Sequence, residues 1–233
     1  MIAPQSLLSR RTLLLSALAL GASACSREAE APASAAADEA APPPPPQAAG
    51  DLPVVALLGD SITAGYGLPA KDALPAQLEA ALAAAGTPAR VRAAGVSGDT
   101  TAGALARVDF SIQDDTDLCV VALGGNDLLQ GIEPATMRAN LEGIITRLKG
   151  RNIPVLLAGM QAPPSYGAYA TDFAAVFEGL ARDHDVALYP FLLDGAALDP
   201  ALNQSDGIHP NAEGVKVIAQ RLAPAVAGAL AGE

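Results

Sequence analysis

Apolar stretches of β-forming residues alternate from residue 52 onward with longer Ala- and Leu-rich stretches of helical periodicity. The apolar stretches predict five strands, at 53–58, 90–95, 117–124, 153–159 and 186–190. The longer stretches predict helices near 73–85, 101–108, 134–150, 167–183 and 211–230. Because apolar strands separated by helices are typical of a parallel sheet with both faces covered, we expect a three-layer α/β/α domain with a five-stranded parallel sheet.

Short polar strings that contain glycine follow three of the predicted strands. GDSITAG follows the first strand, VSGDTT the second and GGND the third, while DGIHPN precedes the last predicted helix. Sheets of this kind bind ligands beyond the carboxyl ends of their strands. We therefore expect the four strings to gather at one edge of the sheet and to form one site.

The first and last strings hold the residue types of nucleophilic catalysis. Ser61 stands in a tight, glycine-flanked turn after the first strand, and Asp206 precedes His209 by three residues. A serine nucleophile needs a base, and that base needs a group that orients it. We therefore predict Ser61 as nucleophile, His209 as base and Asp206 as the carboxylate that holds the imidazole. The alternative for the last string is an ordinary Asp-Gly turn followed by a His-Pro helix start.

Three groups can stabilise the negative oxygen that develops during acyl transfer. The backbone N–H of Ser61 is exposed in its turn, Gly98 has no side chain to block an approaching oxygen, and Asn126 offers a side-chain amide. Taken singly, Gly98 also fits an ordinary turn and Asn126 a helix N-cap. In combination with Ser61 they predict an oxyanion hole.

The four strings resemble, in this order, the four sequence blocks of the SGNH, or GDSL, hydrolase superfamily. GDSITAGYGL, GVSGDTTAGALAR, LGGNDLLQGI and DGIHPNAEG are most similar to the bacterial subgroup of thioesterase I, lysophospholipase L1 and arylesterases. The resemblance covers nearly all of residues 52–230. It implies a flavodoxin-like fold, a catalytic triad of Ser61, His209 and Asp206, and an oxyanion hole of Ser61, Gly98 and Asn126.

The resemblance also implies a carboxylic ester hydrolase that works through an acyl-enzyme and needs neither cofactor nor metal. Its partner is then a small-molecule acyl ester or thioester. Two alternatives stay open: a carbohydrate acetyl esterase of the same superfamily, and a non-catalytic binding lipoprotein. Candidates for an apolar acyl pocket, each of which also fits plain packing, are Phe110, Leu128, Leu129, Ile132, Tyr166 and Tyr169.

Charge and metal-ligand spacing narrow the range of partners. The formal net charge is −11 and no stripe of Lys and Arg is visible, which argues against nucleic acid. The two histidines and two cysteines match no zinc spacing.

We interpret the other histidine, His184, as a solvated residue at a helix end and Cys119 as a buried core residue. We expect a monomer.

Residues 1–24 are typical of a signal peptide. Arg10 and Arg11 precede an apolar stretch of about ten residues, which is too short to span a bilayer as a mature helix. The string SRRTLLL also resembles a twin-arginine signal, and small residues at 22–24 suit a cleavage site. The chain is therefore expected to leave the cytoplasm of a bacterium.

Cys25 directly follows the small residues, as in a bacterial lipoprotein, so we predict that lipid on Cys25 anchors the protein to a membrane in the periplasm. Ordinary cleavage at the same bond is the main alternative, and pairing with Cys119 is another. Residues 25–50 are rich in Ala and Pro and predict a disordered tether. Residues 51–233 are predicted to form the hydrolase domain.

Overall fold

The computed structural model describes residues 52–232, and the predicted signal peptide, Cys25 and tether lie outside them. Five parallel strands form one sheet in the order β2-β1-β3-β4-β5. The strands are β1 (Val54–Gly59), β2 (Arg90–Gly95), β3 (Leu118–Ala122), β4 (Val155–Ala158) and β5 (Ala187–Tyr189). The predicted strands and the parallel sheet are confirmed.

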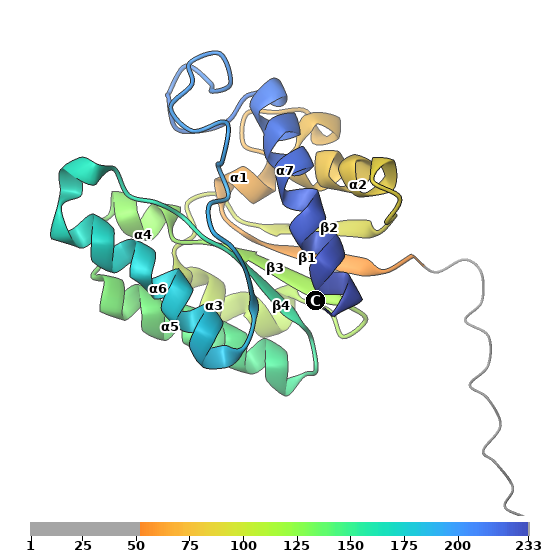
Figure 1. Ribbon diagram of the computed structural model, residues 1–233, viewed down its shortest axis with the longest axis horizontal. Coiled ribbons are helices and arrows are strands. Elements are labelled where there is room, and N and C mark those ends of the chain that lie inside the picture. The colour runs from red at the N-terminus through yellow and green to blue at the C-terminus, as the bar shows by residue number, and fades with distance from the viewer. Residues whose placement is uncertain (1–51, 233) are drawn as a thin grey trace, which may run out of the picture. The chain divides into compact units, whose positions relative to one another are not determined.

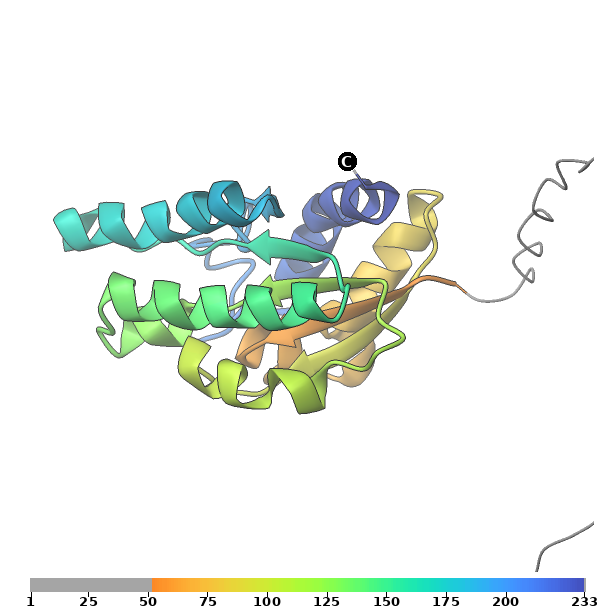
Figure 2. The same cartoon turned by 90° about the horizontal axis from the view of Figure 1, so that it is seen from below.

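Helices cover both faces of this sheet (Figures 1 and 2). On one face α2 (Leu74–Ala84) packs against α7 (Ala212–Ala231). On the other face α3 (Thr101–Ser111) packs against α5 (Pro134–Gly150), and α6 (Ala168–His184) lies beside α5. The three-layer α/β/α architecture is therefore confirmed.

The place of each strand in the sheet explains its composition. Every residue of β1, β3 and β4 is buried, because helices cover both faces of these central strands. The outer strand β2 keeps exposed and half-buried positions, which accommodate Arg90 and Arg92. Cys119 in β3 is fully buried, as predicted, and burial raises the pKa of its thiol to about 12. A thiol of this kind is a packing residue.

Two short helices occupy the loops that leave the sheet at its carboxyl edge. α1 (Ser61–Ala64) follows β1 directly, and α4 (Gly125–Leu129) follows β3. Two 3₁₀ turns, η1 (Ala70–Asp72) and η2 (Pro164–Tyr166), lie in other connections. Among the helices of residues 52–232, none has the length and apolar character needed to cross a membrane.

His184 is the last residue of α6, which matches its predicted place at a helix end. Its side chain is only 19% exposed, however, and its Nε2 lies 3.1 Å from the Oε1 of Glu142 on α5. The interpretation of His184 as a solvated residue was therefore wrong in that respect. The residue pairs two neighbouring helices.

Candidate active site

Ser61, His209 and Asp206 form a continuous chain of hydrogen bonds. The Oγ of Ser61 lies 2.9 Å from His209 Nε2, and His209 Nδ1 lies 2.7 Å from Asp206 Oδ2. Because an ionised carboxylate only accepts hydrogen bonds, Nδ1 carries the ring proton and Nε2 accepts the hydroxyl proton of Ser61. The fold thus brings together a hydroxyl and an imidazole that are 148 residues apart in the chain.

Ser61 is held in place by the caps of its short helix. The Oδ1 of Asp60 accepts from the N–H of Ile62 at 3.0 Å, and its carbonyl oxygen accepts from the hydroxyl of Thr63 at 2.9 Å. Gly65 ends α1 with a φ of 75°, a conformation that favours glycine. Within residues 52–232, the N–H of Ser61 donates to no protein acceptor, as expected at a helix start.

Asp206 holds His209 through both of its carboxylate oxygens. Oδ1 accepts from the backbone N–H of Ile208 at 2.9 Å and of His209 at 3.0 Å, while Oδ2 faces the imidazole. The bond from the His209 N–H, followed by those from the imidazole and from Ile208, lowers the pKa of Asp206 to about 2. Asp206 therefore stays ionised at neutral pH and keeps the ring proton on Nδ1.

The ring of Tyr66 packs on the imidazole of His209, with ring centroids 4.6 Å apart. Gln204 ties the two segments together, because its Nε2 donates to the carbonyl of Tyr66 at 2.9 Å and to that of Pro210 at 3.0 Å. The N–H of Gln204 also donates to the carbonyl of His209 at 2.7 Å. Tyr66 and Gln204 are thus part of the site, although the sequence analysis named neither.

The three predicted oxyanion donors lie in adjacent loops. The Nδ2 of Asn126 donates to the carbonyl of Asp99 at 2.9 Å and, over a longer 3.3 Å, to Asp60 Oδ2. Since Asp99 follows Gly98 and Asp60 precedes Ser61, the amide lies between the loops of the two backbone donors. Gly98 has a φ of 83°, and its N–H donates to no protein acceptor within residues 52–232.

A family model described as the GDSL-like lipase/acylhydrolase family matches residues 57–217, which include the predicted triad and all three predicted oxyanion donors. The chain belongs to the GDSL-like lipase/acylhydrolase family. This finding confirms the resemblance drawn from the four sequence strings.

Relatives of this GDSL hydrolase are bacterial esterases and thioesterases. It is 40% identical over 156 residues to Esterase TesA of Pseudomonas aeruginosa, a match that covers 66% of this chain and 78% of that protein. It is 37% identical over 169 residues to Thioesterase 1/protease 1/lysophospholipase L1 of Escherichia coli, with coverage of 72% and 80%. These relatives and the family show that the chain is a carboxylic ester hydrolase.

Solved structures agree with the fold of this GDSL hydrolase. AlinE4, an SGNH-hydrolase family esterase, is 47% identical with a TM-score of 0.65, and the match covers 77% of this chain and 97% of AlinE4. The crystal structure of TesA is 36% identical with a TM-score of 0.69, covering 74% and 97%. The α/β fold of SGNH hydrolases predicted from the sequence is confirmed.

Asp60 is a buried carboxyl inside the site of this GDSL hydrolase. The residue is only 4% exposed, and burial raises the pKa of its carboxyl to about 6, against the opposing effect of the Ile62 N–H and of His209. The group caps α1 with one oxygen and accepts from Asn126 with the other. Asp60 therefore links the turn of Ser61 to the amide of Asn126 in the adjacent loop.

Asp127, in the same string as Asn126, joins two loops of the GDSL hydrolase rather than facing the triad. Its fully buried carboxylate accepts from the backbone N–H of Thr101 at 2.9 Å and from the Thr101 hydroxyl at 2.6 Å. Thr101 starts α3, and its hydroxyl also accepts from Asn140 on α5 at 3.0 Å. Asp127 thus fixes the loop of Gly98 against the loop of Asn126.

Exposed apolar side chains in loops at the carboxyl edge keep part of the acyl-pocket prediction open. Leu129 and Tyr166 are 63% and 54% exposed. Tyr169 instead donates from its hydroxyl to the carbonyl of Ile132 at 2.8 Å. Phe110 is 93% exposed in the last turn of α3, about 14 Å along a helix that starts at the carboxyl edge. Phe110 is therefore no longer a pocket candidate.

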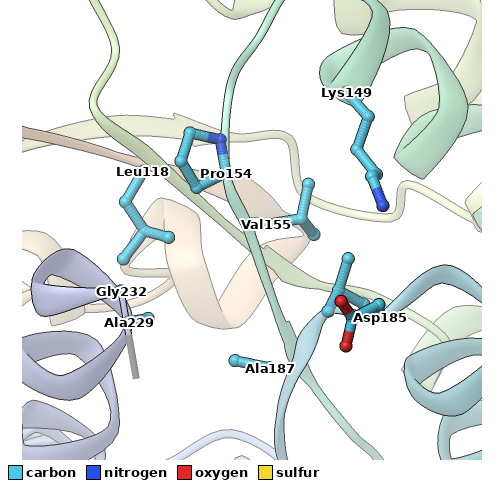
Figure 3. Close-up of a pocket in the computed structure, with 9 residues that line it drawn as sticks. Leu118, Lys149, Pro154, Val155, Asp185, Ala187, Ala229 and Gly232 are labelled. Atoms are coloured by element: carbon cyan, nitrogen blue, oxygen red, sulfur yellow. The ribbon is translucent and has the colours of Figure 1, made fainter.

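A cavity of about 410 Å³ lies at the opposite edge of the sheet (Figure 3). The first residues of three strands, Leu118, Val155 and Ala187, line it together with Lys149 and Asp185. Its position at the amino ends of the strands separates it from the triad.

In the part of the chain that the structure describes, no three His, Cys, Asp or Glu side chains are grouped as a metal site. The expectation of a cofactor-free enzyme stays a prediction.

Proposed function

We propose that this GDSL hydrolase cleaves acyl esters and thioesters with Ser61 as nucleophile, through an acyl-enzyme. The observation that carries the proposal is the chain of hydrogen bonds from Asp206 to His209 to Ser61, at 2.7 and 2.9 Å. Both distances lie within hydrogen-bond range, and the second, between His209 Nε2 and Ser61 Oγ, is one over which a serine can pass its proton to an imidazole. The test is the loss of activity, and of the acyl-enzyme, when Ser61 is replaced.

In the first half of the reaction, His209 Nε2 takes the proton of Ser61 as Oγ attacks the acyl carbonyl. The C–O or C–S bond to the leaving group then breaks, and His209 returns the proton to the departing alcohol or thiol. Water attacks the resulting acyl-serine in the second half, with His209 again as base. Asp206 stabilises the imidazolium in both halves and keeps its own charge, in accord with its lowered pKa.

The tetrahedral intermediates place a negative oxygen opposite the N–H groups of Ser61 and Gly98 and the amide of Asn126. The two backbone donors have no protein acceptor within residues 52–232, so they are available to a substrate oxygen. These two backbone donors are already in place and need no reorganisation during the reaction, and donors of this kind make the largest single contribution to the rate of many acyl transfers.

The substrate class proposed is short to medium acyl chains on aryl or thioester leaving groups, with lysophospholipid as a slower substrate. Support comes from the bacterial relatives, which carry the names esterase, arylesterase and thioesterase 1/protease 1/lysophospholipase L1. It also comes from the exposed apolar side chains Tyr66, Leu129 and Tyr166 in loops at the carboxyl edge. Apolar contact discriminates by only about 1–3 kcal/mol per methylene group, so selectivity for chain length is expected to be gradual.

A chain-length series measured with EDTA present tests this substrate class. The value of kcat/KM for acetyl to dodecanoyl nitrophenyl and coenzyme A esters is expected to change smoothly and to be unaffected by the chelator. Strict selectivity for acetyl groups would instead support a carbohydrate acetyl esterase. Loss of activity with EDTA would contradict the cofactor-free mechanism.

We further propose that lipid on Cys25 holds the enzyme at a membrane of the cell envelope, on the side of the periplasm. The support is the position of Cys25 after the small residues at 22–24, with Ser26 following it. Growth with an alkynyl fatty acid is expected to label the wild-type protein but not Cys25→Ala. Wild-type protein that is unlabelled and free in the periplasm or the medium would show ordinary signal cleavage.

A further inference from the structure

Arg107, in the middle of α3, donates hydrogen bonds to three segments at the carboxyl edge of the sheet. Nη2 donates to the carbonyl of Gly59 at the end of β1 at 2.9 Å, and Nη1 to that of Ala94 near the end of β2 at 2.8 Å. Nε donates to the carboxylate of Asp99 at 2.6 Å, and Nη1 also reaches the Ser111 hydroxyl at 3.0 Å. All three guanidinium nitrogens are thus used.

The Arg107–Asp99 ion pair is buried more deeply than a surface pair. Its side chains are 19% and 13% exposed, whereas those of Arg147 and Asp109 are 46% and 60% exposed. Exposed ion pairs contribute little to the stability of the fold, whereas removing one partner of a buried pair leaves a buried charge without its partner. Arg107 therefore determines where the carboxylate of Asp99 lies.

Asp99 in turn touches two of the three oxyanion donors. Asp99 directly follows Gly98, so its position constrains the backbone of Gly98. Its carbonyl oxygen accepts from Asn126 Nδ2 at 2.9 Å, the shorter of the two bonds that this amide makes. A shift of Asp99 would consequently move both the backbone donor and the side-chain donor.

Gly103 leaves room for this arrangement. A Cβ atom at this position would lie 2.1 Å from Asp99 Oδ1, a distance that real Cβ contacts do not show. A side chain at residue 103 would therefore force the carboxylate of Asp99 to shift. The sequence string GDTTAGALAR therefore holds both ends of the ion pair and the glycine between them.

We propose that Arg107 is a positioning residue of the oxyanion hole, which acts through Asp99 on Gly98 and Asn126. The inference rests on the proposed function, because it assumes that these two groups bind the developing oxyanion. A lysine cannot replace the guanidinium fully: its single ammonium can pair with Asp99 but cannot also follow the geometry of the two strand carbonyls. The contribution of Arg107 is therefore expected in the transition state and not in substrate binding.

The variants Arg107→Gln and Arg107→Lys, assayed with a nitrophenyl ester, test this role. We expect Arg107→Gln to lower kcat by about 10- to 50-fold with KM changed less than about threefold, since a misplaced donor loses part of the effect of a deleted one. Arg107→Lys keeps the charge and is expected to lose roughly 3- to 10-fold. Arg107→Lys also tests the positioning role if Arg107→Gln does not fold.

Arg147→Gln is the matched control. Arg147 also donates to a carbonyl and a carboxylate of α3, those of Leu105 and Asp109, but on the exposed side of the helix. Its replacement is expected to leave kcat within about twofold of wild type. Wild-type kcat in a folded Arg107→Gln or Arg107→Lys would overturn the proposal.

A double-mutant cycle with Asn126→Ala separates positioning from general support of the fold. If Arg107 acts through the donors, Arg107→Gln costs only about 2- to 5-fold in kcat once the amide is absent. An equal loss in both backgrounds would overturn the proposal. Ser61→Ala separates a failure of the proposed function from a failure of the positioning role. Activity that survives in Ser61→Ala overturns the proposed function and, with it, the role of Arg107. Loss of activity in Ser61→Ala, together with wild-type kcat in Arg107→Gln, overturns the positioning role alone.

Discussion

Replacing Ser61 by alanine is expected to lower kcat by about 10⁴- to 10⁶-fold, the range seen when the nucleophile of a triad is removed. His209→Ala is expected to be nearly as severe, because without a base Oγ does not become a nucleophile. Hydrolysis of a short nitrophenyl ester measures the rate. Intact-protein mass spectrometry of quenched reactions is expected to show an acyl adduct in wild type and none in Ser61→Ala.

Asp206→Ala is expected to keep more activity than either of these variants, since Asp206 orients the imidazole and does not react. Ser165→Ala, an exposed serine in η2, is the matched control and is expected to keep wild-type turnover. Circular dichroism verifies that each variant is folded. A folded Ser61→Ala enzyme with a tenth of wild-type turnover would contradict the mechanism.

The long elements of the fold could be predicted because the apolar residues that they bury recur at regular spacing in the sequence. The helix predicted at 134–150 matches α5 at both ends, since its apolar face repeats over 17 residues. The short helices α1 and α4, with four and five residues, were not predicted. Hydrophobic periodicity cannot mark a segment of so few residues.

The residues proposed as triad and oxyanion donors could be selected from the sequence because each lies in a compact string of special residue types. The functional importance of Gln204 and Arg107 could not be predicted, since the contacts that tie them to the other segments of the site are tertiary. The carbonyl of Tyr66 is 138 residues from Gln204, and that of Gly59 is 48 residues from Arg107. An Arg in a helix is usually solvated, and only the position of α3 over the ends of β1 and β2 gives Arg107 its two carbonyl partners.

Asn126→Ala is expected to lower kcat by about 10²- to 10³-fold, the usual loss when one oxyanion donor is removed, with little change in KM. The reason is that the amide meets the carbonyl oxygen most strongly after it has become negative. The effect is smaller than that of Ser61→Ala because the N–H groups of Ser61 and Gly98 remain.

Steady-state kinetics of Asn126→Ala with one ester checks the role, since kcat and KM separate transition-state from ground-state binding. Asn126→Gln is the companion variant: it keeps an amide but moves it by one methylene group, away from the carbonyl of Asp99 at 2.9 Å. A loss in Asn126→Gln close to that in Asn126→Ala indicates that placement, and not the mere presence of an amide, sets the rate. A change in KM alone would make Asn126 a substrate-binding group, and the oxyanion hole would then consist of the two backbone donors.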